Sequence, residues 1–408
     1  MSSSPRIRRI LILSSNTGGG HRSAAAALAA AARQSFAPGA CDVRISNAVE
    51  ESHPLSARLV GLYNWLLRNR QHWMKYFYWS VNRFRPDANE FFYKRSARYL
   101  HTLLESWPPD AIVSVHPLVQ HIPARILKER NLAARIPLLC VVTDPGYGFW
   151  RGWACDGVAI YFVAGEEARR QLIDFGISPE RIRIPGMPVH PKFVAPGEDS
   201  VRAARAALGL DPGTFTVLVN AGYEGGGNIL RIFRELLRAD LPADPAIQAI
   251  FVAGRNAQLQ ARAQSIASNA RFPVVVLGYC EQMEQAMAAS SVMISKLGGM
   301  TTFEAFACGL PVIADVTTPP MPQEAAAAEL LRARGAGVLL GRAANVGAEI
   351  RRMLQDPAYY SALRSAAAAM AVPDAARRIM REVAALLSER CDGVESPARA
   401  EAFSASLR

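Results

Sequence analysis

The sequence lacks three features that would each define a class of protein. Its six cysteines are scattered, with no paired spacing, which argues against a disulfide framework and against a cysteine-based zinc site. No apolar run reaches the roughly 18 to 20 residues that cross a bilayer. The apolar run behind the basic N-terminus is also too short for the core of a secretory signal. These absences favour a protein that works in a reducing cytosol.

Acidic residues are also scarce, because 35 Asp and Glu stand against 46 Lys and Arg, a formal net charge of +11. This excess favours anionic partners such as nucleic acid, acidic lipid or nucleotide phosphates. The Asp-x-Asp pair of many metal-dependent sugar transferases is missing as well. Neutralisation of a phosphate would then fall to backbone dipoles and basic side chains, so we expect neither a metal ion nor another cofactor.

Short apolar strands alternate with helices along most of the chain, which predicts an α/β fold with parallel sheets covered on both faces. A stretch rich in proline and glycine, residues 185–197, separates two such series. We therefore predict two doubly wound, Rossmann-like domains, 1–195 and 196–375, with a cleft between them. Residues 376–408 are expected to form a helix and a polar tail. The predicted strands are 10–13, 41–46, 111–115, 136–142, 158–163, 216–220, 249–252, 274–277, 292–295 and 311–314.

The first strand runs directly into Gly18-Gly19-Gly20 and His21, and an alanine-rich helix follows. This arrangement presents backbone N–H groups and a positive helix end to an anion. A helix N-terminus disfavours the imidazolium ion, which keeps His21 neutral and able to take a proton. A lone histidine is more often structural, but its position after three glycines favours a general base. Asp144, between a strand and Pro145, is either a second acid or base or a turn aspartate.

A second motif begins where the strand 292–295 ends. Gly298-Gly299 precedes a helix that starts near Thr301, and backbone N–H groups at such a site suit a diphosphate. Glu304, one turn into the helix, is placed to accept hydrogen bonds from two ribose hydroxyls. The alternative is a plain helix start in which Glu304 is a capping-box acid. A further glycine loop at 222–227 also precedes a predicted helix.

Residues 63–99 combine aromatic rings with basic side chains and few acidic ones. Trp73, Trp79, Arg83 and Arg85 belong to this aromatic-basic region. Such a mixture suits the interface of an anionic membrane or single-stranded nucleic acid. The alternative is that many of the rings pack helices together.

Together these residues resemble the family of monogalactosyldiacylglycerol synthases and processive diacylglycerol β-glucosyltransferases, in glycosyltransferase family 28. The likeness runs from about residue 8 to residue 387, and it is most specific over 296–313, Lys-Leu-Gly-Gly-Met-Thr-Thr-Phe-Glu-Ala followed by Gly-Leu-Pro-Val-Ile. Thr143-Asp144 and residues 185–189 match in place and spacing. The chain departs from the family pattern at Ala327, where an asparagine is common, and in the residues after Asp144.

The resemblance implies a GT-B fold, with a lipid acceptor on the first domain and a UDP-sugar on the second. His21 would be the base on the acceptor hydroxyl, and Glu304 would hold the ribose. Gly19 and Gly20 would face the acceptor, and the aromatic-basic region would dock on anionic lipid. The other implied donor-binding residues are Gly222, Gly278, Tyr279, Cys280, Gly299, Met300, Thr301, Gln323 and Glu324.

We therefore expect an inverting, metal-independent transferase, peripheral on the inner face of the cell membrane, that moves glucose or galactose from UDP-hexose to diacylglycerol or a related lipid. Two other enzymes remain open at this stage. One is a UDP-N-acetylglucosamine-type transferase with another lipid acceptor, and the other is a non-hydrolysing UDP-sugar 2-epimerase, which would need no lipid. A non-catalytic protein that binds nucleic acid or membrane is the third alternative. The intact His21 and Glu304 speak against it, and no nucleic-acid partner is expected.

Overall fold

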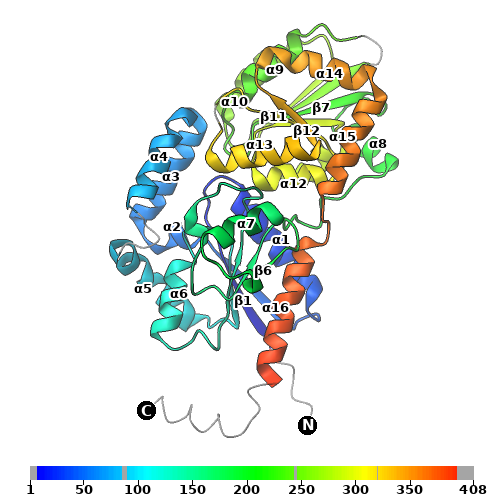
Figure 1. Ribbon diagram of the computed structural model, residues 1–408. Helices are drawn as coiled ribbons and strands as arrows, with labels where there is room; N and C mark the ends of the chain where they lie inside the picture. Colours follow the sequence, from blue (N-terminus) through cyan, green and yellow to red (C-terminus); the bar gives the residue numbers. More distant parts are fainter. Residues whose placement is uncertain (1–6, 85–89, 243–245, 319, 393–408) are drawn as a thin grey trace.

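A computed structural model describes residues 7–84, 90–242, 246–318 and 320–392. Its two six-stranded sheets are parallel throughout, and they lie in separate layers with helices on both faces (Figure 1). The first sheet has the order β2-β1-β3-β4-β5-β6 and the second the order β12-β11-β10-β7-β8-β9. The strands are β1 (Arg8–Leu13), β2 (Cys41–Ser46), β3 (Ala111–Ser114), β4 (Leu138–Val141), β5 (Ile160–Phe162), β6 (Ile182–Arg183), β7 (Phe215–Asn220), β8 (Ile247–Val252), β9 (Val274–Leu277), β10 (Val292–Ser295), β11 (Val312–Asp315) and β12 (Gly337–Leu340).

The central strands are apolar at almost every position because both faces of each sheet are covered. Residues 10–13 of β1 and all of β8 are buried. The covering helices are α1 (Gly20–Ser35), α6 (His121–Glu129), α7 (Glu166–Asp174), α8 (Glu198–Ala207), α9 (Ile229–Arg238), α10 (Ala257–Ala267), α11 (Met283–Ala288), α12 (Gly299–Ala307), α13 (Pro322–Arg334), α14 (Val346–Gln355) and α15 (Pro357–Met370). This architecture confirms the predicted α/β fold with two doubly wound sheets.

The last described helix, α16 (Ala375–Asp392), returns from the second sheet to the first (Figure 1). It packs against α1, and its residues Ile379 and Val383 are fully buried. The alanines of α1 leave room for this contact, because small side chains let helix backbones approach closely. The polar tail predicted after this helix, residues 393–408, lies outside the described residues.

In the region 54–104 the sequence shows no clear alternation of strands and helices, and the described residues of this region are mostly helical. Between β2 and β3 the chain forms α2 (Ala48–Ser52), α3 (Pro54–Asn69), the 3-10 turn η1 (Gln71–Trp73), α4 (Met74–Phe84) and α5 (Glu90–Ser106). Among the described residues, none of the helices is both long enough and apolar enough to cross a bilayer. The short strands β6 and β12 were also not predicted, since β6 has only two residues.

Candidate active site between the two sheets

His21 is the second residue of α1, at the carboxyl end of β1. Its Nδ1 lies 2.7 Å from the carbonyl oxygen of Val115 and 3.2 Å from the hydroxyl oxygen of Thr143. A carbonyl oxygen can only accept a hydrogen bond, so Nδ1 carries the proton in the neutral ring. Nε2 is then left with its lone pair, which is the form that a general base requires.

A second imidazole, which the sequence analysis did not single out, lies against the first. The rings of His21 and His116 are 4.4 Å apart at their centroids, in an edge-to-face arrangement. The backbone N–H of Leu118 donates to Nδ1 of His116, so its Nε2–H faces the hydroxyl of Thr17. Burial lowers the pKa of His21 to about 4. Burial, and next the neighbouring His21, lower the pKa of His116 well below its usual value, so both rings are neutral at pH 7.

Asp144 lies near these rings, on the loop that follows β4. Its Oδ2 accepts a hydrogen bond of 2.7 Å from the indole N–H of Trp153, whose ring is 6.2 Å from that of His21. Burial raises the pKa of Asp144 to about 6, and the hydrogen bond from Trp153 opposes the rise. Near pH 6 the carboxyl group of Asp144 is therefore partly protonated, and the imidazole of His21 beside it is neutral.

An apolar cavity of about 640 Å³ borders both groups. Its wall includes His21, His116 and Asp144, together with side chains from α2, α3, α4 and α5. The apolar lining residues of these helices are Ala48, Val49, Leu59, Val60, Phe77, Val81, Phe84, Phe91 and Leu100. A volume of this size suits a drug-sized or larger apolar ligand, with the polar groups fixing its orientation.

The predicted donor residues of α12 begin where this helix meets the loop after β4, which carries Thr143 and Asp144. A β-carbon added to Gly299 would stand 2.5 Å from the carbonyl oxygen of Thr143, so glycine is required where the two domains meet. Glu304 is buried, and its Oε1 accepts a hydrogen bond from the hydroxyl of Ser23 in α1. Burial raises the pKa of Glu304. Gly299, Met300 and Thr301 form the first turn of α12, where the two domains meet, and the side chain of Met300 is buried there.

Gly19 and Gly20 contact the second domain rather than line the apolar cavity. A β-carbon at Gly19 would stand 2.7 Å from Cβ of Tyr223, and one at Gly20 would lie 3.5 Å from Met300. The two glycines were predicted to face the acceptor. In the structure they allow the loop after β1 to approach the loops after β7 and β10.

The loop after β7 contains Gly222, whose φ of +77° is a conformation that favours glycine. Its neighbour Tyr223 makes an edge-to-face contact with Tyr279, with centroids 5.6 Å apart. The guanidinium of Arg255 lies 5.1 Å from one of these rings and 5.3 Å from the other. Arg22 of the first domain donates to the hydroxyl of Tyr223. Tyr279 was among the predicted donor-binding residues. Tyr223, Arg255 and Arg22 were missed, because they lie on three further segments of the chain.

The remaining predicted donor residues differ in their surroundings. Gly278, Tyr279 and Cys280 follow β9, and Tyr279 is 46% exposed. Oε2 of Glu324 accepts a hydrogen bond of 3.0 Å from the backbone N–H of Met321, at the start of α13. That carboxyl group is thus a helix cap in this structure, which is a structural role that the prediction did not include. The side chain of Gln323 lies outside what the structure describes.

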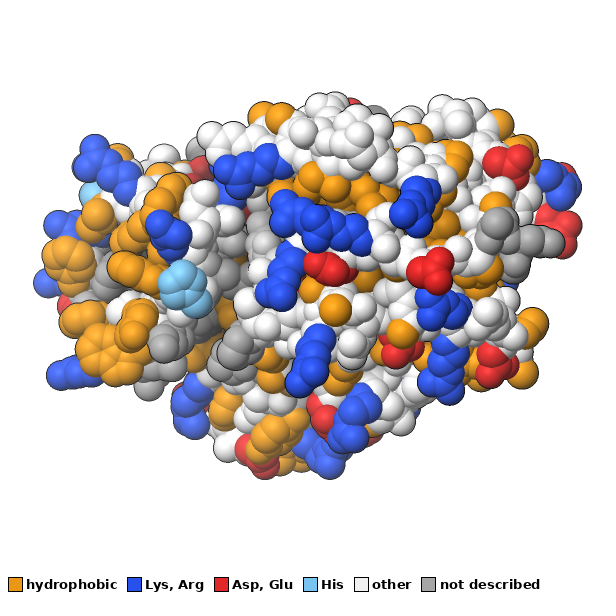
Figure 2. Space-filling model, turned by 90° about the horizontal axis from the view of Figure 1, so that it is seen from above, with side chains coloured by type: hydrophobic (Ala, Val, Ile, Leu, Met, Phe, Trp, Pro, Cys, Tyr) orange, Lys and Arg blue, Asp and Glu red, His pale blue; other side chains and the backbone are white. Residues whose placement is uncertain are grey.

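Aromatic residues of α3, η1 and α4 are exposed. Trp65, Trp73 and Trp79 are 52%, 54% and 65% exposed, and Arg83 is exposed near them in sequence. Figure 2 shows hydrophobic side chains interleaved with Lys and Arg at its left, over α3 and α4. We call the exposed side chains of residues 55–84 the aromatic face. Arg85, predicted to belong to it, lies outside the described residues. The described part of the chain holds no group of three or more His, Cys, Asp or Glu side chains placed to bind a metal ion.

The burial of Asp144 yields a prediction for stability. A carboxyl group whose pKa rises from 3.8 to about 6 on folding costs the folded state about 3 kcal/mol at pH 7. Below pH 3.8 the group is protonated in both states and the cost is absent. We therefore expect Asp144→Asn, which keeps an acceptor for Trp153, to raise the free energy of unfolding at pH 7 by up to about 3 kcal/mol. The gain should shrink as the pH falls from 7 to 4.

Urea unfolding across that pH range measures the effect, with Asp156→Asn, a change at an exposed aspartate, as the matched control. An Asp144→Asn gain that stays constant between pH 7 and pH 4 would contradict the burial argument.

Comparisons with known proteins agree with this geometry. Residues 21–189 match the family model of monogalactosyldiacylglycerol (MGDG) synthase, and residues 225–379 match the glycosyltransferase family 28 C-terminal domain. A probable chloroplastic monogalactosyldiacylglycerol synthase of Nicotiana tabacum is 32% identical over 257 residues, which are 62% of this chain and 47% of the relative. The chain thus spans about half the length of the plant relatives that it matches.

A processive diacylglycerol beta-glucosyltransferase of Bacillus subtilis is 27% identical over 318 residues, 77% of this chain and 79% of the relative. Among solved structures, a UDP-GlcNAc 2-epimerase of Neisseria meningitidis bound to UDP-GlcNAc superposes with a TM-score of 0.59 at 14% identity. The match covers 92% of this chain and 99% of the epimerase, and it supports the GT-B fold alone.

The two family models fall on the two sheets in the order that the resemblance implied, and the relatives match across both. The first domain thus matches the monogalactosyldiacylglycerol synthase family, the second matches the C-terminal domain of glycosyltransferase family 28, and the chain as a whole is similar to enzymes that carry both.

Proposed function

We propose that this protein transfers a hexose, glucose or galactose, from a UDP-sugar to diacylglycerol or a related lipid, with inversion to a β-glycolipid. The observation that supports this best is the half-buried His21, which lines an apolar cavity, keeps the lone pair of its Nε2, and follows Gly20, a residue that lies against Met300 at the start of α12. The relatives' names, which include monogalactosyldiacylglycerol synthase and diacylglycerol beta-glucosyltransferase, point to the same substrates.

In this proposal the acyl part of the acceptor fills the cavity, and its hydroxyl group lies against His21. Nε2 takes the hydroxyl proton as the oxygen attacks the anomeric carbon, and the bond from that carbon to the UDP oxygen breaks. A positioned histidine base typically contributes about 10²–10⁴-fold to the rate. The neutral state of the ring at pH 7 suits this role, because a protonated ring cannot accept the proton.

The leaving UDP collects negative charge at the cleft, where the N–H groups at the start of α12 and the loop at Gly222 are available. Such preorganised dipoles stabilise charge that develops in the transition state. Glu304 is proposed to bind the two ribose hydroxyls, with the hydroxyl of Ser23 now occupying one of its oxygens. We propose that no resident metal or other cofactor takes part, and that the donor and the lipid are the substrates.

We further propose that the aromatic face rests on an anionic membrane, at the inner face of the cell membrane. Exposed tryptophans beside arginines are typical of interfacial anchors. Helices α3 and α4 carry these side chains and also line the apolar cavity. A lipid could then pass from the membrane into the site without crossing water. This arrangement has no use in a 2-epimerase of free UDP-sugars, so that alternative is not favoured.

A product assay tests the proposed function. Purified protein, vesicles containing diacylglycerol, and labelled UDP-glucose or UDP-galactose should yield a labelled β-glycolipid. In His21→Ala we expect turnover to fall by about 10²–10⁴-fold, because the base is lost. UDP affinity should stay within about twofold, since His21 faces the acceptor cavity. Conversion of the free UDP-sugar without any lipid would contradict the transferase assignment, and unchanged turnover in His21→Ala would contradict the base assignment.

Vesicle binding tests the aromatic face. Replacing both Trp73 and Trp79 with serine removes two exposed rings, and we expect the partition to anionic vesicles to weaken by at least about tenfold. Cosedimentation with vesicles measures the bound fraction. Val194→Ser, a change at another exposed apolar residue, is the matched control. If the double variant binds as the parent does, the membrane contact lies elsewhere.

A further inference from the structure

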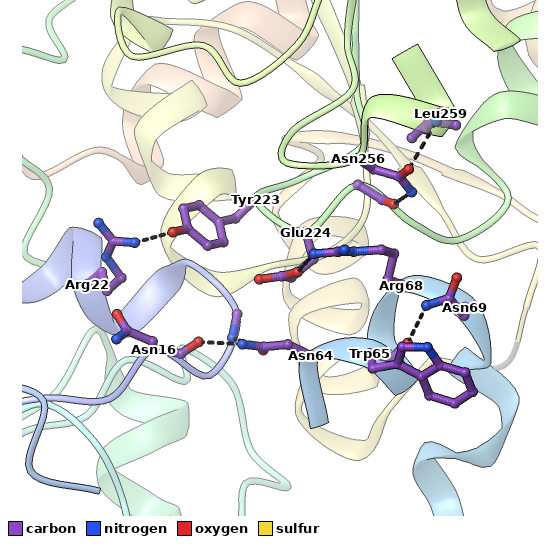
Figure 3. Close-up of polar contacts among 12 residues, drawn as sticks. Asn16, Arg22, Asn64, Trp65, Arg68, Asn69, Tyr223, Glu224, Asn256 and Leu259 are labelled. Carbon is purple, nitrogen blue, oxygen red and sulfur yellow. Dashed lines mark hydrogen bonds and ion pairs between the residues drawn. The ribbon is translucent and has the colours of Figure 1, made fainter. Parts of the chain in front are cut away.

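Helix α3 contacts the acceptor cavity, the loop that carries the candidate base, and the donor-side glycine loop. Val60, Asn64 and Arg68 lie four residues apart and therefore share one face of the helix. Val60 lines the cavity. Asn64 and Arg68 occupy the next two turns, toward the second domain. Trp65, exposed and part of the aromatic face, belongs to the same helix (Figure 3).

Asn64 fixes the loop before α1 with both ends of its amide. Its Oδ1 accepts a hydrogen bond of 3.0 Å from the backbone N–H of Gly18, and its Nδ2 donates one of 2.9 Å to the carbonyl oxygen of Asn16 (Figure 3). The loop leads directly into His21, so its backbone path sets where the imidazole stands. A movement of α3 therefore moves the candidate base.

Arg68 reaches the second domain. Its Nη2 lies 2.5 Å from Oε2 of Glu224, whose side chain is only 11% exposed. A β-carbon at Gly226 would stand 2.7 Å from the carbonyl oxygen of Leu67, so the end of α3 and the glycine loop are in close backbone contact. From the other side, the Nδ2 of Asn256 donates to the carbonyl oxygen of Gly225 at 2.7 Å (Figure 3). The loop that contains Gly222 is thus held between α3 and its own domain.

We propose that α3 couples filling of the acceptor cavity to donor binding, with Asn64 and Arg68 as positioning residues. This inference rests on the proposed function. An acceptor chain against Val60 favours the position of α3 at which Arg68 and Glu224 pair, and the pair in turn holds the donor loop in its binding geometry. Coupling of this kind is reciprocal, because each ligand changes the other's affinity by the same factor. The consequence is that donor is held most firmly when a lipid is ready to react.

UDP binding tests the coupling without turnover. Calorimetry with detergent micelles, with and without diacylglycerol, should show that the lipid tightens UDP binding of the parent protein by at least about fivefold. In Arg68→Ala the same comparison should show less than a twofold effect. The charge reversal Arg68→Glu with Glu224→Arg should restore part of it. Arg130→Ala, which removes an exposed ion pair with Glu105 inside the first domain, is the matched control and should keep the coupling.

A lipid effect that is equal in the parent protein and in Arg68→Ala would overturn the inference, as would a parent protein that binds UDP equally well with and without lipid. Neither result would contradict the proposed function, because both concern only the effect of lipid on UDP binding. A parent protein that binds no UDP at all would overturn the proposed function, and the inference with it.

Asn64 is tested by kinetics. We expect Asn64→Ala to lower kcat about tenfold, because the base is misplaced, while KM for the UDP-sugar stays within about twofold. Asn69→Ala is the control from the same helix, since among the described residues the Asn69 side chain donates a hydrogen bond only to the carbonyl oxygen of Trp65. A rise in KM with kcat unchanged would contradict the positioning role of Asn64.

Discussion

The carboxyl-terminal ends of the strands of two parallel sheets face each other in this protein. The chains approach so closely at that contact that several positions have no room for a β-carbon. Gly299 abuts the carbonyl oxygen of Thr143, Gly19 abuts Tyr223, and Gly226 abuts Leu67. Each contact joins a strand-end loop or helix of one domain to one of the other. The reaction proposed here needs the acceptor hydroxyl, held by a base on one side, and the anomeric carbon of the donor, held by a diphosphate site on the other, to come within bond-forming distance. The glycines therefore serve the approach of the two domains as much as any contact with a ligand.

Removal of water gives this contact its chemistry. His21 and His116 are packed against each other, and the loss of hydration disfavours the imidazolium form of each. The carbonyl oxygen of Val115 then decides which nitrogen of His21 keeps its lone pair. Burial also disfavours the charged form of Asp144 and so raises the pKa of its carboxyl group. A site of this kind lowers stability in exchange for reactive groups of defined protonation, which is a common property of active sites.

Helix α3 extends this arrangement to the surface. Its exposed residues belong to the aromatic face, and its inner residues line the cavity. Its last two turns bond to the loop after β1 in the first domain and to the loop after β7 in the second. A peripheral enzyme with a lipid acceptor benefits from a single rigid element that senses the membrane and the donor together. In the proposed function, the insertion between β2 and β3 that contains α3 would therefore join the membrane contact to the acceptor cavity and to the donor loop.

Local sequence determined the α/β fold, the glycine loops and the described strands other than β6 and β12, because buried parallel strands are continuous apolar runs and because glycine marks the turns after them. It also singled out His21 at the start of a helix, Asp144 after a strand, and Glu304 in the second turn of a helix that follows a glycine loop. The sequence analysis did not predict the helices α3, α4 and α5, because exposed aromatic rings obscure the helical period on which such a prediction depends. The sequence analysis did not single out His116, Tyr223 or Arg255, because their contacts are with residues distant in the chain. How the domains pack decided the pairing of Ser23 with Glu304 and of Arg68 with Glu224. It also decided the contacts of Gly19 and Gly20 with the second domain. A local pattern records which residues can end a strand, but only the folded arrangement determines which strand ends meet.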